Sequence, residues 1–387
     1  MIIYSKTKRD ESFFSAWLEI NLDNLKRNFL TIKKFVGDKK IISVVKANAY
    51  GHGALMVAKE LEQLGTDMLA VANVEEGIEL RKGGINKPIL IFGFIFPEEI
   101  NLLMDFSLTP TIYSETLAKE LNKQVEKRKE KIKIHIKIDT GMARVGIAWN
   151  ESLGFIKRIK ALKGLEIEGL YSHFSSADEK NSAFSEIQFR RFKKVIEQLN
   201  KEKINIPIKH MSNSAALLNF PQFNLDAVRP GILLYGLNPL PEKLEFKIYP
   251  VMALKTRVIF MKEIKAGVSV GYGRTFYAKR PSLIATVPLG YADGYPRTLS
   301  NKGEVLVKGR RAGIVGRICM DSLMIDVTDI KNPKEGDEVV VIGKSGKEEI
   351  TVEELANLCQ TINYEIACGI KERVKRFYIK NGKSRKE

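Results

Sequence analysis

Lys46 has the clearest potential for covalent chemistry in this 387-residue chain. It ends the apolar run IISVV and is followed by the segment ANAYGHG (47–53). A lysine at the end of a buried strand has a lowered amine pKa, and its neutral amine can form a Schiff base with an aldehyde. The alternative is a lysine whose amine extends to solvent at the rim of the fold. Position alone leaves both interpretations open.

Two later segments are typical of phosphate binding. Ser214 lies in NSAALLN (213–219), and Gly231 lies in RPGILLYG (229–236). A glycine allows the backbone to approach a ligand closely, and a serine adds a hydroxyl to the N–H groups at a helix start. Each residue taken alone is also compatible with an ordinary helix cap or turn.

The four histidines do not suggest a metal site, because neither HxH nor HExxH occurs. His173 and His210 each follow an apolar run, so they could tune neighbouring groups. His135 lies inside the alternating IKIHIK and is expected in the core. His52 stands in a glycine-flanked loop, and its role stays open.

Eight short apolar runs alternate with amphipathic charged segments between residues 40 and 240. This strand–helix repeat predicts an α/β fold, a (β/α)8 barrel over residues 15–245, with a doubly wound open sheet as the alternative. Functional residues of a barrel lie at the C-terminal ends of its strands, where Lys46, Arg144 and His173 stand. The runs are 41–47, 67–73, 88–94, 108–114, 131–139, 165–174, 207–213 and 226–236.

The pattern changes after Pro250 to closely spaced strand-like runs separated by Gly and Pro, which predicts a mostly-β domain over 246–380. One helix, VEELANLCQTINYEIACGI, is expected near its end. The early run WLEINL could add a strand to this domain. Residues 1–14 and 381–387 are expected to be tails, the second of them disordered.

Composition narrows the class of protein. The net charge is +17, but 63 Lys and Arg are mixed with 46 Asp and Glu along the chain. No nucleic-acid-binding signature accompanies them, so no nucleic-acid partner is expected. The three cysteines Cys319, Cys359 and Cys368 have neither disulfide nor zinc spacing. No signal peptide or membrane-spanning run is seen, so a cytoplasmic protein without a membrane partner is expected.

Nine segments in order along nearly the whole chain resemble the alanine racemase family. A single short motif would be weak evidence, but nine in sequence order are specific. One departure is visible, because the family's TGMGR is TGMAR here, with Ala143 in place of glycine. The segments are VVKANAYGHG (44–53), KIDTGMARVG (137–146), YSHFSSAD (171–178), HMSNSA (210–215), RPGILLYG (229–236), VGYGRTF (270–276), LGYADGYPR (289–297), VGRICMD (315–321) and NYEIACGI (363–370).

The resemblance implies a barrel that binds pyridoxal 5'-phosphate, a β domain behind it, and a head-to-tail homodimer whose active sites are shared between subunits. Lys46 would carry the cofactor and act as one base, and Tyr272 of the partner subunit would be the opposite base. Arg144 and the Met320 backbone N–H, the latter from the partner, would bind the substrate. Tyr50, Ser214, Gly231, Ile232 and Tyr364 would hold the phosphate.

Arg229 would face the pyridine nitrogen, with His173 linking it to Tyr272 and His210 supporting it. An arginine only donates hydrogen bonds, so the ring nitrogen would stay unprotonated and side reactions would be limited. An acidic residue there would suit a decarboxylase. Asn213 beside Ser214 and Lys137, which many family members carry in carbamylated form, would be supporting residues.

The implied activity is the interconversion of L- and D-alanine by two bases, with D-alanine supplied to cell-wall peptidoglycan. Bulky groups such as Tyr364 and Tyr272 imply a small substrate. A broad-specificity or serine racemase on the same scaffold is the alternative. A non-catalytic protein that binds the cofactor is a further alternative, although such relatives are single-domain barrels.

Overall fold

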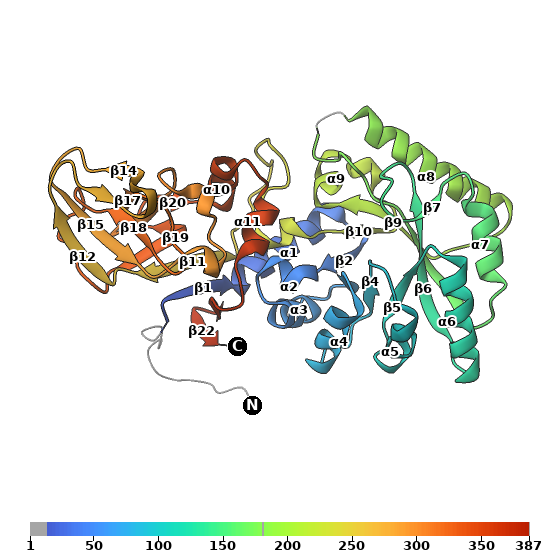
Figure 1. Cartoon of the computed structure of the whole chain (residues 1–387). Coiled ribbons are helices and arrows are strands. Elements are labelled where there is room, and N and C mark those ends of the chain that lie inside the picture. Colours follow the sequence, from blue (N-terminus) through green and yellow to red (C-terminus); the bar gives the residue numbers. More distant parts are fainter. Residues whose placement is uncertain (1–13, 180–181, 387) are drawn as a thin grey trace.

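The computed structural model describes residues 14–179 and 182–386. A barrel and a β-rich domain lie side by side along the long axis of the molecule (Figure 1). Residues 1–13 of the expected N-terminal tail lie outside the described residues. Among the described residues, no helix has the length and apolar character needed to cross a membrane.

Eight parallel strands form a closed barrel. They follow the order β5-β4-β3-β2-β10-β9-β8-β6, and β5 also pairs with β6, with Thr111 opposite His135. This closure confirms the predicted (β/α)8 barrel and excludes the open sheet. The strands are β2 (Lys40–Val44), β3 (Met68–Val71), β4 (Ile89–Ile91), β5 (Thr109–Ile112), β6 (Ile132–Asp139), β8 (Leu165–Tyr171), β9 (Ile208–Asn213) and β10 (Ala227–Arg229), with β7 (Ile147–Ala148) added beside β6.

Helices cover the outside of the barrel (Figure 1). Several begin at side chains that cap the first turn, such as Asn73 and Ser114, which accept hydrogen bonds from Glu76 N and Leu117 N. Their apolar residues recur at helical spacing and face the strands. The helices are α1 (Leu22–Val36), α3 (Ala54–Gln63), α4 (Val74–Lys82), α5 (Ile100–Asp105), α6 (Glu115–Lys127), α7 (Ser152–Lys160), α8 (Ala183–Lys201) and α9 (Ser214–Asn219), with short 3-10 turns η2 (Pro97–Glu99), η3 (Pro221–Phe223) and η4 (Ile232–Tyr235).

The second domain is mostly β, as predicted. Its largest sheet has the order β17-β16-β19-β11-β1-β21-β22, with β20 beside β19, and a smaller sheet has the order β12-β15-β18. The strand predicted at WLEINL is β1 (Ala16–Asn21), which lies between β11 and β21. The other strands are β11 (Met252–Arg257), β12 (Phe260–Ile264), β13 (Ser269–Val270), β14 (Phe276–Tyr277), β15 (Ser282–Val287), β16 (Glu304–Val307), β17 (Arg310–Gly313), β18 (Leu323–Asp326), β19 (Glu338–Ser345), β20 (Glu348–Ile350), β21 (Lys375–Lys380) and β22 (Lys383–Lys386).

The single helix expected near the end is two helices, α10 (Val352–Cys359) and α11 (Asn363–Gly369). Gln360 adopts a left-handed conformation with φ 57°, which ends α10. The break turns α11 toward the barrel, where it contacts the segment after Lys46. The prediction of a single helix was therefore wrong, and the break between the two helices is what positions Tyr364 on α11.

The segment 381–387, for which disorder is expected from the sequence, contains one further strand. Lys383–Lys386 form β22, which pairs with β21 through a two-residue turn at Asn381 and Gly382. Both turn residues have positive φ, of 52° and 67°, which suits an Asn-Gly hairpin. Glu387 lies outside the described residues.

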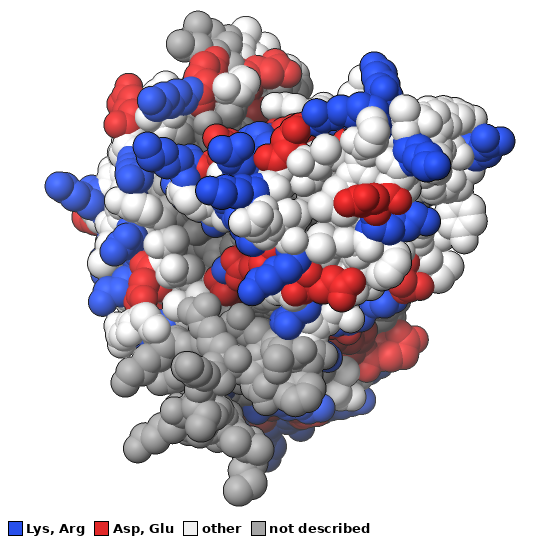
Figure 2. Space-filling view, turned by 90° about the vertical axis from the view of Figure 1, so that its left-hand side faces the viewer, with Lys and Arg blue, Asp and Glu red and all other residues white. Residues whose placement is uncertain are grey.

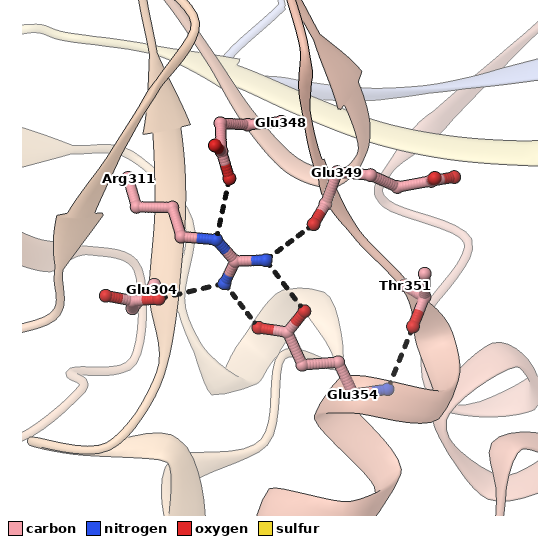
Figure 3. A network of polar contacts seen from close by, with 6 residues as sticks. All are labelled: Glu304, Arg311, Glu348, Glu349, Thr351 and Glu354. Carbon is pink, nitrogen blue, oxygen red and sulfur yellow. Dashed lines mark hydrogen bonds and ion pairs between the residues drawn. The ribbon is translucent and has the colours of Figure 1, made fainter.

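Arg311 ties three elements of the β domain together (Figure 3). From β17, its guanidinium contacts Glu304 on β16, Glu348 on β20 and Glu354 on α10. It also donates to the backbone carbonyl of Glu349 at 2.6 Å. These carboxylates raise the pKa of Arg311, so the cation is permanent and the cluster acts as one charged network.

Charges of both signs alternate over the end of the molecule seen in Figure 2. Basic and acidic side chains lie interspersed among the described residues of that face. The high net charge is therefore spread rather than gathered on this side. This arrangement gives no support there to a nucleic-acid-binding surface.

Candidate active site

A cavity of about 400 Å³ opens at the C-terminal ends of the barrel strands. The predicted barrel residues line it, except for His210, which lies beneath Arg229. Tyr364 reaches the cavity from α11 of the β domain. The full lining is Val44, Lys46, Tyr50, Ala72, Phe92, Gly93, Lys137, Arg144, Val145, Tyr171, His173, Asn213, Ser214, Arg229, Gly231, Ile232 and Tyr364.

Lys46 enters the cavity from the segment labelled α2 (Lys46–Tyr50), directly after β2. Burial, and next the positive charge of Arg144, lower the pKa of its amine, while Glu76 acts in the opposite direction. The structure thus places the amine inside the barrel mouth rather than at the outer rim. A partly desolvated amine is suited to covalent attachment and to proton transfer.

The residues after Lys46 form a left-handed turn. Ala47, Asn48, Ala49 and Tyr50 all have φ between 51° and 54°. For residues other than glycine this conformation costs roughly 1–2 kcal/mol each, although Asn48 is better suited to it. The turn must therefore be held by its surroundings.

His52 stabilises this turn through hydrogen bonds to its backbone. Its Nδ1 lies 3.0 Å from the carbonyl of Ala49 and 2.9 Å from that of Tyr50. Carbonyls only accept, so Nδ1 carries the proton. Burial lowers the pKa of His52 to about 4, so the ring stays neutral. The role left open by the sequence is thus support of the turn.

A small cradle lies where α9 and η4 begin. The Ser214 hydroxyl accepts the backbone N–H of Gly231 at 2.9 Å and that of Leu233 at 3.4 Å. A Cβ on Gly231 would lie 2.5 Å from the Tyr50 hydroxyl, so only glycine leaves this space free. The ring of Tyr364 packs against that of Tyr50, with the ring centroids 6.0 Å apart. The hydroxyls of Ser214 and Tyr50, together with the start of a helical turn at Gly231, suit the binding of a phosphate.

Arg229 forms the floor of the cavity and is fully held by neighbours. It donates to the carbonyls of Ser172 and Met211, both at 2.8 Å. It also contacts Nδ1 of His210 at 2.8 Å and Nδ1 of His173 at 3.1 Å. Burial lowers the pKa of Arg229 to about 10, so it remains a cation at neutral pH.

The donor character of Arg229 fixes the histidine tautomers beneath it. Because Arg229 only donates, His210 must accept at Nδ1 and carry its proton on Nε2. His210 Nε2 lies 2.9 Å from Nδ1 of His135, whose own Nε2 lies 3.5 Å from a Glu168 oxygen. Burial, and next the charge of Arg229, lower the pKa of His210 and of His173, so both rings stay neutral.

Lys137 and Arg144 complete the positive lining. Lys137 is buried, and its amine lies 4.7 Å over the Tyr171 ring. Burial, then Arg229 and Arg144, lower its pKa to about 7. Arg144 follows Ala143, which has a φ of 55°, a conformation that favours glycine. The backbone N–H of Ala143 is held by Asp139 at 3.2 Å, together with those of Gly141 and Met142.

Tyr272 and Met320 do not join the barrel cavity of their own chain. Both stand on the β domain, with 70% of Tyr272 and 54% of Met320 exposed. Tyr272 lines a separate cavity of about 450 Å³ that also contains Cys319. The structure therefore divides the predicted site residues between two surfaces of one chain.

Besides the apolar and glycine lining of the cavity, sequence reasoning missed two polar residues at or beside the site, Tyr171 and Glu76. Tyr171 lies within a quoted motif and stacks on His210 with ring centroids 4.8 Å apart. Glu76 lies in the first turn of α4, where its carboxylate accepts the N–H of Ala47. That turn follows β3, so the rule that barrel sites gather after strands was the available signal.

Comparisons with known proteins agree on one family. Residues 20–239 match the model of the alanine racemase N-terminal domain, and residues 251–378 match that of the C-terminal domain. An alanine racemase of Halothermothrix orenii is 49% identical over 94% of this chain and 96% of its own length.

Solved structures extend the similarity to three dimensions. An alanine racemase of Clostridium difficile 630 has a TM-score of 0.92 at 40% identity, covering 96% of this chain and 97% of its own. Another from Bartonella henselae, solved with covalently bound pyridoxal phosphate, has a TM-score of 0.85 at 32% identity. It covers 94% of this chain and 99% of its own.

Proposed function

The chain belongs to the alanine racemase family, and we propose that it interconverts L- and D-alanine with two bases, Lys46 and Tyr272. The observation that carries this proposal is the convergence of Lys46, Arg229 and the Ser214–Gly231 cradle on one cavity. An amine, a fixed cation and a hydroxyl-lined cradle in one cavity suit a cofactor that carries both an aldehyde and a phosphate.

The cavity residues fit pyridoxal 5'-phosphate. Gly231 leaves space beside the Tyr50 hydroxyl, and the backbone N–H groups of Gly231 and Ile232 begin a helical turn there. Lys46 would hold the aldehyde end, Arg229 the pyridine nitrogen, and Tyr50, Ser214 and Tyr364 the phosphate. When bound, the cofactor makes the proton on the substrate α-carbon acidic by delocalising the charge left behind.

The residues of the chain then bind the substrate and move one proton. Lys46 Nζ takes or returns the α-proton on one face, and Tyr272 Oη does so on the other. Arg144 and the Met320 backbone N–H orient the substrate carboxylate. Arg229 keeps its protons and so would leave the pyridine nitrogen unprotonated. His173 and His210 hold the Arg229 guanidinium in its orientation.

Lys137 would add a negative charge to this lining once modified. With its pKa near 7, a large share of its amine is neutral and able to react with carbon dioxide. The resulting carbamate, formed with release of one proton, would orient Arg144. Asn213 would support Ser214 by capping α9, where its side chain accepts the N–H of Ala216 at 2.9 Å.

A second copy of the chain would supply Tyr272 and Met320 to each barrel. Exposed apolar and aromatic side chains are found on both parts of the chain, Phe94 and Phe96 after β4 and several residues of the β domain. Burying such side chains favours association. The β-domain group is Ile259, Phe260, Val268, Tyr272, Tyr277, Tyr291 and Met320.

Alanine is the preferred substrate in this proposal, and serine a poorer one. In the shared site, Tyr364, Tyr272 and the cofactor would leave room for little more than a methyl group, although one added atom is discriminated only modestly. The D-alanine would be made in the cytoplasm for peptidoglycan. Loss of circular dichroism from L-alanine, compared with L-serine at equal concentration, measures this preference.

Subunit complementation tests the shared site. Lys46→Ala and Tyr272→Phe are each expected to lower activity at least about 100-fold. In a heterodimer of the two variants, one of the two sites has both native residues. Random pairing should therefore restore about one quarter of the wild-type activity in an equal mixture.

The matched control pairs Lys46→Ala with Arg229→Ala. Both changes lie on the barrel, so no heterodimer of these variants has an intact site and activity should stay low. Native mass spectrometry reports whether the chains have exchanged. Exchange without recovery in the Lys46→Ala and Tyr272→Phe mixture would mean that the two bases do not come from different subunits.

A further inference from the structure

Glu76 makes two short contacts that no proposed catalytic role explains. One carboxylate oxygen accepts the backbone N–H of Ala47 at 2.7 Å, and the other accepts that of Ala72 at 2.7 Å. Hydrogen bonds to a carboxylate are among the stronger ones in proteins. One side chain thus joins the residue after Lys46 to the residue after β3.

Glu76 is itself held in place for this task. It lies in the first turn of α4, and its backbone N–H is bound by the Asn73 side chain at 2.9 Å. An acidic residue at this end of a helix is also favoured by the helix dipole. The carboxylate is therefore a fixed anchor rather than a mobile surface group.

The bond to Ala47 acts on Lys46 through the peptide that links them. The N–H of Ala47 belongs to the peptide unit that begins at the Lys46 carbonyl, and Ala47 is the first residue of the left-handed turn. Fixing that N–H fixes the orientation of the Lys46–Ala47 peptide plane, which contains the Cα from which the Lys46 side chain branches. It also fixes the start of the strained turn. The next residue, Asn48, ties the turn to the start of α3, since its side chain accepts the N–H of Ala54 at 2.7 Å.

We propose that Glu76 is a positioning residue that aims the Lys46 amine by clamping the backbone N–H groups of Ala47 and Ala72. The part of this inference that concerns catalysis rests on the proposed function of Lys46. The clamp has a separate consequence for cofactor retention, because Tyr50 lies at the end of the same turn. Glu76 also places a negative charge near the amine, which favours its protonated form.

The test compares Glu76→Gln with Glu75→Gln in the full-length enzyme loaded with pyridoxal 5'-phosphate. A glutamine keeps the shape but has one accepting oxygen, so at least one of the two bonds is lost. Glu75 is exposed in the same helical turn and serves as the control. We expect cofactor affinity, followed by visible absorbance, to fall roughly tenfold in Glu76→Gln and to be unchanged in Glu75→Gln.

The second readout is the isotope effect with α-deuterated alanine in each direction. A misplaced Lys46 should raise the isotope effect in the direction in which Lys46 removes the proton and leave the Tyr272 direction unchanged. A general loss of structure would alter both directions together. Unchanged cofactor affinity, or equal changes in both directions, would overturn the proposal.

Glu76→Asp keeps the question answerable if Glu76→Gln does not fold. The shorter aspartate keeps the charge but cannot span both N–H groups, so a smaller loss of the same kind is expected. Absence of racemisation in the wild type would refute the proposed function instead, and the affinity comparison would still test the clamp.

Discussion

Gly231 has room for a hydrogen atom and little else. A methyl group there would lie 2.5 Å from the Tyr50 hydroxyl and 3.0 Å from its ring, inside the proposed phosphate cradle. Gly231→Ala should therefore displace Tyr50 and weaken cofactor binding by about tenfold or more, the usual scale of an overpacked site. Titration with pyridoxal 5'-phosphate, followed by absorbance, measures the change.

Gly313→Ala is the matched control for Gly231→Ala. Gly313 has nothing within 4 Å of the added carbon and lies on β17, outside the cavity. It should bind the cofactor as the wild type does. Equal affinity in both variants would show that the space beside Tyr50 is not used by the phosphate.

Sequence reasoning reached the site residues that follow their own strands. Lys46, Ser214 and Arg229 stand next to apolar runs, so their meeting at one end of the barrel followed from the fold. Glu76 did not, because its role depends on a backbone N–H 29 residues away. A carboxylate in the first turn of a helix is too common to single out before tertiary contacts are known.

At the scale of elements, the Arg311 cluster links the β16–β17 hairpin, β20 and α10 (Figure 3). Arg311→Met should leave three carboxylates without their shared cation and lower stability by roughly 1–3 kcal/mol, the scale of hydrogen bonds to charged groups. Urea unfolding measures this loss, which should shrink at high salt as the remaining charges are screened.

Arg280 gives the comparison for Arg311. Its guanidinium pairs with Asp329, and both side chains are largely exposed. Arg280→Met should change stability by less than about 1 kcal/mol, as is usual for surface pairs. If Arg311→Met and Arg280→Met lowered the free energy of unfolding equally, the cluster would stabilise the domain no more than an isolated surface pair does.

Hydrophobic periodicity predicted the eight barrel strands but not every boundary in the β domain. The split between α10 and α11 and the hairpin that forms β22 both depend on residues with positive φ, Gln360 and Asn381. Gln360 carries no strong local signal for that conformation. Asn381 does, because Asn-Gly between strand-like residues indicates a two-residue turn.

At the scale of the whole molecule, His52, His135 and His210 are buried, His173 is half-buried, and all four have lowered pKa values, chiefly through loss of solvent. The unfolded chain binds protons at these rings below about pH 6.5 while the folded chain does not. Stability should therefore fall as the pH decreases from 6.5 toward 4. For His52, with its pKa near 4, the loss of folding free energy on going from neutral pH to about pH 4 reaches about 3 kcal/mol.

His52→Asn should make this decline shallower. An asparagine can still donate to the carbonyls of Ala49 and Tyr50 but does not titrate. Urea unfolding at pH 7.5 and pH 5 compares the variant with the wild type. An unchanged difference between the two pH values would mean that His52 takes up no extra proton on unfolding.

The position of β1 gives the barrel an unusual attachment. Ile20 pairs with Met252, and Asn21 N donates to Val251 O at 2.8 Å, so the chain leaves and re-enters the β domain at one point. In topological terms, the barrel occupies the place of a loop within a β hairpin. A single proteolytic cut between residues 237 and 250 would leave the barrel joined to the β domain through β1. Because β1 and β11 are paired strands, they should also restrict rotation of one domain against the other more than a single linker would.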